Sequence, residues 1–295
     1  MSHESRPGTP GAGEPRGAGT AGEVVVRETV CKSILNRSTL GEYSLNCYTG
    51  CAHACAYCYA RFMQRFHPHP EAWGEFVDVK VNAVEVLKRQ LRRLEPGEVF
   101  VSSACDGWQP IEAEYRLTRR CCELLVERGF QVNVLSKSAL VRRDLDLFSP
   151  GNATIGTTVT TLDERLAALW EPGGSPVHER LGVLEEARRL GLRTSIMFGP
   201  LLPFLSDDQG SIEGLFERAA GVGVSRVWVD ALNARPRVWP AVAELLGREF
   251  PELREPYRKV LFERTSREGY LARLRGRVAQ AAERFAMTGR VSHCF

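Results

Sequence analysis

The sequence has no apolar run that approaches the roughly 18 residues needed to suggest a membrane span, so no membrane partner is expected. Its first residues lack the hydrophobic run of a secretory signal. Residues 1–22 are instead rich in Gly, Pro, Ala and Arg, which predicts a disordered N-terminal tail. No phosphate-binding loop of the Walker type is present. The net charge is only +3, so composition does not require a polyanionic partner.

Nine cysteines stand out in an otherwise ordinary globular composition. Without a secretory signal, they indicate metal or redox chemistry in a cytoplasmic protein rather than a disulfide framework. Cys51, Cys55 and Cys58 form a C-x3-C-x2-C spacing, and Tyr57 and Tyr59 flank the last cysteine. Structural zinc closes on four ligands, whereas three thiolates leave one position of a [4Fe–4S] cluster open. The alternatives are a zinc knuckle that borrows a distant Cys or His, and three unrelated buried thiols.

The spacing followed by tyrosine resembles the signature of radical S-adenosylmethionine (AdoMet) enzymes. The resemblance implies that Cys51, Cys55 and Cys58 hold three irons of a [4Fe–4S] cluster and that AdoMet chelates the fourth. It also implies that the reduced cluster cleaves AdoMet to methionine and a 5′-deoxyadenosyl radical. An external electron donor, such as a flavodoxin or ferredoxin, would reduce the cluster.

Predicted strands and helices alternate along the middle of the chain. Six strands are marked by Ser44, Val99, Val132, Thr154, Thr194 and Val227. A helix is predicted over residues 82–94 with Asn82 as its N-cap, and another ends at Gly129. The alternation predicts βαβ units, and six units are too few for a closed eight-strand barrel. The expected fold is therefore α/β: a partial (β/α)6 TIM-like barrel over residues 23–235, with a helical C-terminal extension over residues 236–295 packed on it.

The extension is locally basic. Residues 254–290 carry ten Arg or Lys and four Asp or Glu. A solvated helix over one end of the barrel explains this excess. The alternative is a surface for a nucleic acid or another phosphate-bearing substrate.

Polar stretches follow several predicted strands, at the edge where parallel α/β folds place their functional groups. They are the cysteine loop and residues 102–110, 136–138, 157–161 and 198–203, the last with Asp207 and Asp208. The segments SSACDGWQPIE (102–112), LSKS (135–138), TTLDE (160–164) and GPLLP (199–203) carry a further resemblance. Over about residues 46–230 the chain resembles the spore photoproduct lyase-like branch of the radical AdoMet superfamily. The resemblance implies that Cys105 returns a hydrogen atom to a substrate radical and that Tyr57 and Tyr59 relay the radical. It also implies that Lys137 contacts the AdoMet carboxylate.

Four further side chains at these strand ends are expected to bind the AdoMet amino group and ribose: Ser103, Asp106, Thr158 and Thr160. For Cys105 the alternative is a small buried hydrophobe, for the tyrosines a shield around the cluster, and for Lys137 an ordinary exposed lysine. His53 is interpreted as a spacer, and Cys294 as a loosely held terminal residue.

The sequence therefore predicts a cytoplasmic, lyase-like radical AdoMet enzyme that abstracts hydrogen from a substrate it does not identify. The loop between Cys105 and Leu117 is longer than in spore photoproduct lyase, so DNA photoproduct repair is an alternative rather than the main prediction. The other alternative is a non-catalytic iron–sulfur or zinc protein with a binding or sensing role.

Overall fold

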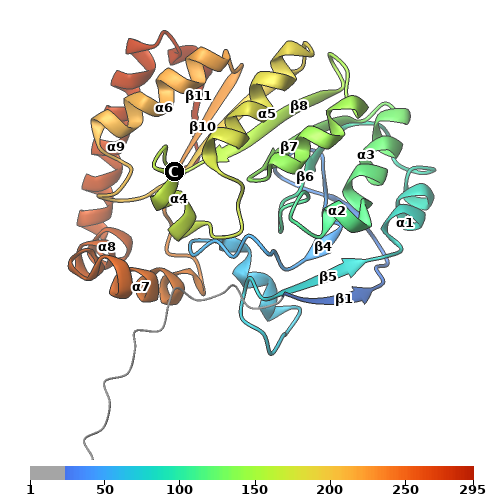
Figure 1. Ribbon diagram of the computed structural model, residues 1–295, viewed down its shortest axis with the longest axis horizontal. Helices are drawn as coiled ribbons and strands as arrows, with labels where there is room; N and C mark the ends of the chain where they lie inside the picture. Colours follow the sequence, from blue (N-terminus) through green and yellow to red (C-terminus); the bar gives the residue numbers. More distant parts are fainter. Residues whose placement is uncertain (1–23) are drawn as a thin grey trace, which may run out of the picture.

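The computed structural model describes residues 24–295 (Figure 1), so the predicted N-terminal tail over residues 1–22 lies outside the described residues. Between residues 24 and 295, no helix is both long and apolar enough to cross a membrane.

The main element is an eight-stranded sheet with the strand order β11-β10-β9-β8-β7-β6-β3-β2. Neighbouring strands pair in parallel, except β2, which is antiparallel to β3. The strands are β2 (Leu35–Arg37), β3 (Tyr43–Leu45), β6 (Glu98–Val101), β7 (Gln131–Ser136), β8 (Ala153–Val159), β9 (Arg193–Leu201), β10 (Arg226–Ala231) and β11 (Val291–His293). All six predicted strand positions fall in β3 and β6–β10. The α/β class and the open, partial barrel are confirmed.

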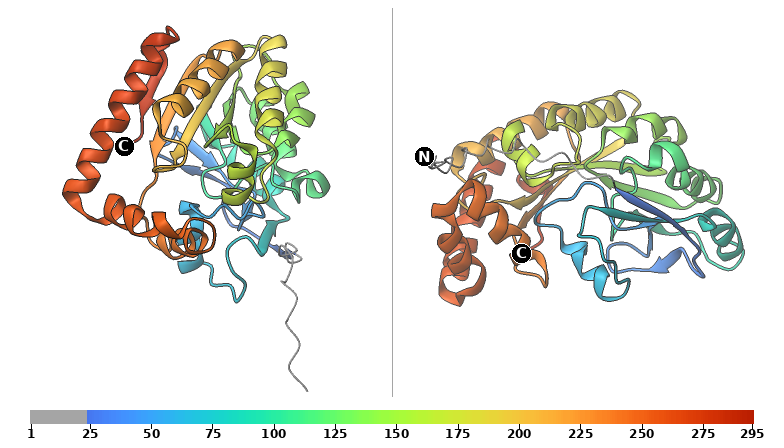
Figure 2. Two further views of the ribbon diagram at one scale, coloured as in Figure 1. Left: turned by 60° about the vertical axis from the view of Figure 1, so that its left-hand side comes forward. Right: turned by 60° about the horizontal axis from the view of Figure 1, so that its bottom comes forward.

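Helices cover the convex face of this sheet, and the N-terminal part of the chain lies in its concavity (Figure 2). The covering helices are α1 (Ala83–Gln90), α3 (Leu117–Glu127), α5 (Val177–Arg189), α6 (Gln209–Val222) and α9 (Arg264–Arg284). Along β7, Val132 and Val134 are buried while Leu135 is partly exposed, and β10 alternates in the same way. This period of two places the buried side chains between the sheet and the helices, and it directs the less buried side chains to the concave face.

Local chemistry explains several helix boundaries. Gly129 follows α3 with a φ of +77°, the left-handed conformation that glycine adopts readily, as predicted. Asp208 caps α6 by accepting a hydrogen bond from the backbone N–H of Ser211. Asn82 is the N-cap residue of α1, as predicted, but its side chain makes no capping hydrogen bond. Its amide instead exchanges two hydrogen bonds with the backbone of Cys31, at 2.8 and 3.0 Å.

A second sheet of three strands carries the cysteine motif. It pairs β1 (Val25–Thr29), β5 (Phe76–Lys80) and β4 (Tyr48–Thr49) in the order β1-β5-β4. The chain leaves β4 directly into the cysteines and then forms the 3-10 helix η1 (Tyr59–Arg65). The start of the motif is therefore held by strand pairing.

The C-terminal part contains α7 (Val238–Glu249), α8 (Arg254–Phe262) and α9, and then returns to the sheet as β11. The sequence did not predict β11, which pairs in parallel with β10. Several arginines of residues 254–290 are bound within the chain: Arg267 to the carbonyl of Leu232, Arg277 to that of Asp207 and Arg290 to that of Val224. The proposed division of the chain at residues 22 and 235 stays a prediction.

Candidate functional site

The cysteine loop, residues 50–58, is fastened by the side chain of Gln109. The amide oxygen of Gln109 accepts a hydrogen bond from the N–H of Ala52 at 2.8 Å, and its amide nitrogen donates to the carbonyl of Gly50 at 3.3 Å. Gln109 is fully buried. One side chain from the segment after β6 therefore satisfies two backbone groups of the loop, which a loop without regular structure would otherwise leave unpaired.

The segment after α4 (Glu164–Trp170) holds the other side of the cysteine loop. The N–H of Ala56 donates to the carbonyl of Trp170 at 2.9 Å, and the N–H of Gly173 donates to the carbonyl of His53 at 3.1 Å. A Cβ atom at Gly173 would lie 2.2 Å from the carbonyl oxygen of Ala52, closer than real Cβ contacts come. Glycine is required here because the two backbones touch.

His53 is more than a spacer. Its Nδ1 lies 3.3 Å from Oδ2 of Asp106, and both side chains are buried. Asp106 also accepts hydrogen bonds from the backbone N–H groups of Trp108 and Lys137 and from the hydroxyl of Ser136, at 2.8 to 2.9 Å. Burial favours the neutral acid, but His53 and these donors outweigh it and lower the pKa of Asp106. The carboxylate thus joins the cysteine loop to the end of β7.

A cavity of about 480 Å³ lies in the concavity, where the strands end. That volume falls within the usual range of small-ligand sites. Its lining includes Cys55, Cys58, Lys137, Thr158, Asp230 and Cys294. Residues that follow β6, β7 and β10, together with residues within β8 and β9, meet the cysteine loop there, as the topology of a parallel sheet predicts.

The three motif thiols differ in their surroundings. Cys55 and Cys58 line the cavity, while Cys51 packs behind them in a small apolar cluster with Trp73 and Phe76. Burial raises the pKa of all three thiols. The pKa of Cys55 rises to about 12, although the nearby charge of Lys137 opposes the effect of burial. A bound metal or cluster would favour the thiolate form of these side chains.

The chemistry of the donor set is compatible with an iron–sulfur cluster. Cys51, Cys55 and Cys58 are three thiols on one short loop, and thiolates are the ligands that such clusters take.

A buried charged cluster lies next to the cysteine loop. Glu171 forms an ion pair with Arg180 at 2.5 Å, and both side chains are about 1% exposed. Burial disfavours the charged form of Glu171, but Arg180 and Lys137 outweigh this effect and lower its pKa. Burial likewise disfavours charged Lys137, but Cys55 and Glu171 outweigh it and raise its pKa. Lys137 is therefore a cation whose side chain reaches the cavity.

The two motif tyrosines occupy different positions. The hydroxyl of Tyr57 donates to Glu171, and Thr160 donates to the same carboxylate at 2.6 Å. Burial and the charge of Glu171 raise the pKa of Tyr57 well above its usual value. Tyr59 donates to the carbonyl of Ser103 and is more exposed. Both rings line the cavity.

The structure separates the predicted cofactor residues into two groups. Asp106, Lys137 and Thr158 line the cavity with Tyr57 and Tyr59. Three predicted site residues, Ser103, Thr160 and Cys105, are not part of the cavity lining. Thr160 binds Glu171 instead, and the hydroxyl of Ser103 accepts from Asn46 at 3.0 Å. Cys105 packs beside the apolar cluster of Cys51, and burial raises its pKa to about 12, which keeps its S–H bond intact.

Sequence reasoning missed four residues of the site: Glu171, Arg180, Asp230 and Cys294. Glu171 follows α4 and Arg180 lies in α5, so neither stands at a strand end where functional groups were sought. Asp230 is the penultimate residue of β10 and could have been found by that rule. Cys294 was interpreted as loose, but its N–H donates to the carbonyl of Val229 at 2.9 Å, which fixes it beside the cavity.

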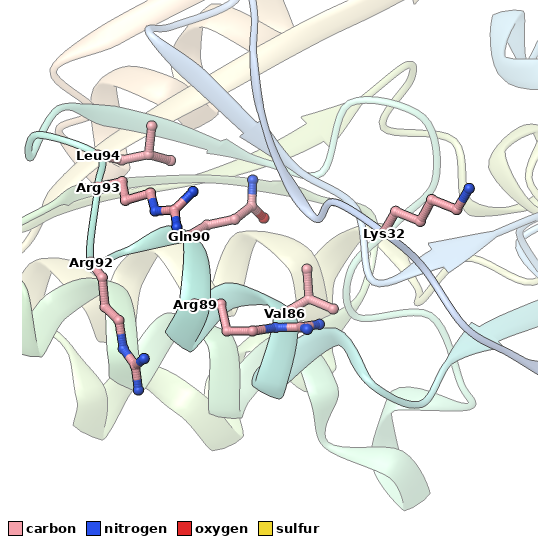
Figure 3. Close-up of a pocket in the computed structure, with 7 residues that line it drawn as sticks. All are labelled: Lys32, Val86, Arg89, Gln90, Arg92, Arg93 and Leu94. Atoms are coloured by element: carbon pink, nitrogen blue, oxygen red, sulfur yellow. The ribbon is translucent and has the colours of Figure 1, made fainter.

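A second hollow, of about 410 Å³, lies at the end of α1. Its lining contains four basic side chains, Lys32, Arg89, Arg92 and Arg93, and no acidic ones (Figure 3). None of the four forms an ion pair within residues 24–295. Unpaired positive charge is therefore concentrated here, whereas several arginines of residues 254–290 bind groups of the chain.

The sequence profile of the Radical SAM superfamily matches residues 45–212, more than half of the chain, from the end of β3 into α6. The chain belongs to the radical SAM superfamily. Membership implies an enzyme that uses AdoMet and an iron–sulfur cluster and that needs a reductant. The resemblance inferred from C-x3-C-x2-C is confirmed.

Several relatives are similar over long stretches. An uncharacterised protein of Mycobacterium tuberculosis is 30% identical over 90% of this chain and 82% of its own. One from Methanocaldococcus jannaschii is 32% identical over 56% of this chain, which spans 62% of that relative's length. A radical SAM Nα-GlyT isomerase of Pseudomonas phage M6 is 29% identical over 68% of this chain and 41% of its own.

Solved structures of spore photoproduct lyase share the fold. The variant with bound AdoMet and dinucleoside spore photoproduct superposes with a TM-score of 0.68 at 15% identity, over 93% of this chain and 82% of that one. This likeness establishes the architecture.

Proposed function

We propose that the protein is a cytoplasmic enzyme that cleaves AdoMet reductively at a [4Fe–4S] cluster held by Cys51, Cys55 and Cys58, and uses the radical to abstract hydrogen from a substrate. When bound, the cluster and AdoMet supply one electron and a 5′-deoxyadenosyl radical. The observation that carries the proposal is that Cys55 and Cys58 open onto a cavity lined by polar strand ends. The cluster's electron would come from a flavodoxin- or ferredoxin-like donor.

Lys137 is the chain's group for the AdoMet carboxylate. It is cationic, lies at the end of β7 and lines the same cavity as Cys55. An ammonium ion in a partly desolvated site binds a carboxylate more strongly than it does in water. Glu171 and Arg180 neutralise each other beside it, so the single positive charge of Lys137 stays available. Thr158 adds a hydroxyl from the end of β8, whereas Asp106 supports the site by fixing His53 and Lys137.

Tyr57 and Glu171 form a pair that suits a radical relay. Oxidation of a phenol releases its proton, and the carboxylate of Glu171 already accepts the hydrogen bond of that hydroxyl. Cys105 retains its proton and can return a hydrogen atom to a carbon radical. Because Cys105 does not line the cavity, Tyr57 or Tyr59, which do line it, would link the two. The backbone carbonyl of Ser103 accepts the hydrogen bond of Tyr59. Thr160 donates to Glu171, which is the hydrogen-bond partner of Tyr57.

The substrate class has one specific candidate. The structures with the same fold bind a dinucleoside photoproduct, and the second hollow carries four unpaired basic side chains that suit phosphate groups. Repair of a DNA photoproduct by carbon–carbon bond cleavage is therefore the second candidate function. A non-catalytic iron–sulfur or zinc protein is the remaining alternative, and it predicts no cleavage of AdoMet.

The test is anaerobic reconstitution with iron and sulfide, followed by dithionite and AdoMet. The wild-type protein is expected to release 5′-deoxyadenosine and methionine, measured by liquid chromatography with mass spectrometry. Cys51→Ala should abolish the release, and Cys31→Ser, a change outside the cysteine loop, should not. A reconstituted wild-type protein that leaves AdoMet intact would refute the proposed function.

A further inference from the structure

Cys294 brings a thiol from the far end of the sequence to the cavity of the cysteine loop. β11 pairs in parallel with β10, and the N–H of Cys294 donates to the carbonyl of Val229 at 2.9 Å. This hydrogen bond extends the ladder by one residue and fixes the backbone that carries the thiol. Cys294 then lines the cavity together with Asp230 and with Cys55 and Cys58 of the cysteine loop.

The cavity that Cys294 enters is the one onto which Cys55 and Cys58 open. Its volume of about 480 Å³ is that of a small-ligand site, and the charged residues Lys137 and Asp230 also line it. Cys294 is itself exposed, unlike Cys51 and Cys55. Its thiol therefore lies in the candidate site and not in the apolar core.

The two candidate hydrogen donors have different access to that site. Cys105 packs beside Cys51 and Trp73 and does not line the cavity, whereas Cys294 does. Burial and the neighbouring Asp230 raise the pKa of Cys294, so the thiol keeps its proton at neutral pH. Position and protonation state both suit Cys294 as a direct donor.

Resting on the function proposed above, we propose that Cys294 is a hydrogen-atom donor to a carbon radical in the cavity. The S–H bond of Cys294 breaks homolytically, a C–H bond forms on the radical carbon, and a thiyl radical remains on Sγ. One electron from the flavodoxin- or ferredoxin-class donor and one proton from solvent return the thiyl radical to the thiol. The step needs no further oxidant or reductant.

The first test uses the full chain, with its cluster reconstituted and added thiols removed. In D₂O the thiol of Cys294 carries deuterium, and AdoMet with dithionite produces 5′-deoxyadenosine without any added substrate. Wild-type product is expected to contain one deuterium on the 5′ carbon in most molecules. Cys294→Ala should lose most of this label, while Cys31→Ser should keep it.

The outcomes separate the two proposals. If the wild-type protein releases no 5′-deoxyadenosine, the proposed function fails, and the role of Cys294 fails with it. If 5′-deoxyadenosine forms but its deuterium content is the same in wild type and Cys294→Ala, the inference about Cys294 alone is overturned. Loss of the label in Cys105→Ala with retention in Cys294→Ala also overturns it.

A second readout does not depend on turnover. Iodoacetamide labelling of the reconstituted, unreduced protein is followed at each cysteine by peptide mass spectrometry. AdoMet at ten times its Kd should slow alkylation of Cys294 about tenfold, because one bound ligand excludes the reagent in proportion to its occupancy. Labelling of Cys31 should not change. Equal alkylation of Cys294 with and without AdoMet would place its thiol outside the binding site and overturn the inference.

Discussion

Gly173→Ala tests how the cysteine loop is held. The added methyl group would lie 2.2 Å from the carbonyl oxygen of Ala52 and 2.8 Å from the Cα atom of His53. Both neighbours are backbone atoms, so no side-chain rotation relieves the overlap, and the loop must move. Overpacking that shifts backbone typically costs 1–3 kcal/mol, and we expect about 2 to 3 kcal/mol here. At roughly 2 °C per kcal/mol for a chain of this size, the Tm should fall by about 4 to 6 °C.

The assay is thermal unfolding, together with iron bound per chain after anaerobic reconstitution. Gly221→Ala is the matched control, because a Cβ atom at Gly221 would meet nothing within 4 Å and the residue lies in α6. That change should stabilise the protein by about 0.5 to 1 kcal/mol through helix propensity. Gly173→Ala is also expected to bind less iron, because the displaced loop carries the cysteines. Wild-type Tm and wild-type iron content in Gly173→Ala would refute this account of the loop.

Three further predictions address charge. Glu171→Gln leaves the buried arginine beside it without its anion, and should lower the free energy of unfolding by about 3 to 5 kcal/mol in urea. Burial raises the pKa of Asp230 from 3.8 to about 6. Because the carboxyl ionises first in the unfolded chain, the free energy of unfolding should fall as pH rises between these values. Asp230→Asn should therefore stabilise the cluster-free protein at pH 8 by about 1 to 2 kcal/mol. Joint replacement of Arg89, Arg92 and Arg93 by Ala should weaken DNA binding, measured by fluorescence anisotropy, and reduce the slope of log K against log salt by up to about 3.

Each of these predictions has a control and an outcome that contradicts it. Glu255→Gln removes an exposed ion pair and should change stability by less than about 0.5 kcal/mol; an equal effect at Glu171 would show that burial of that pair does not matter. A pH profile unchanged by Asp230→Asn would mean that the carboxyl does not titrate as its surroundings suggest. Joint replacement of Arg254, Lys259 and Arg273 by Ala is the charge-matched control for DNA binding. Equal losses in both triple variants would leave the second hollow without a special role.

The sheet could be predicted because its strands obey local rules. Val132 and Val134 in β7 and Val227 and Val229 in β10 alternate with less buried residues, between helices of ordinary length, and this period of two indicates strands. β11 has only three residues, and no alternation of predicted helices and strands surrounds it in the sequence. Its pairing depends on α9 returning the chain to the open edge of β10, which is a tertiary effect.

The site was predictable where a motif or a strand end carried it. Cys55, Cys58, Lys137 and Thr158 were found by these two rules, and the structure brings them to one cavity. Glu171 was not found, because a carboxylate after a short helix resembles any surface acid until its burial is known. The ion pair to Arg180 becomes visible only when α4 and α5 are placed against the cysteine loop.

The role of Cys105 came from resemblance, and those of Ser103 and Thr160 from their place at the strand ends. Ser103 and Thr160 follow their strands, yet their hydroxyls bind Asn46 and Glu171 and not the cavity. Strand-end position determines which edge of the sheet a residue reaches, but not the direction of its side chain. That direction depends on the partners that surround it.

The central claim is tested most directly by incubating the anaerobically reconstituted full-length protein with AdoMet and dithionite and measuring 5′-deoxyadenosine. Release of 5′-deoxyadenosine by the wild-type protein, with none from Cys51→Ala or from protein without iron, is the predicted result. A wild-type protein that binds a stoichiometric [4Fe–4S] cluster but leaves AdoMet intact would contradict the account.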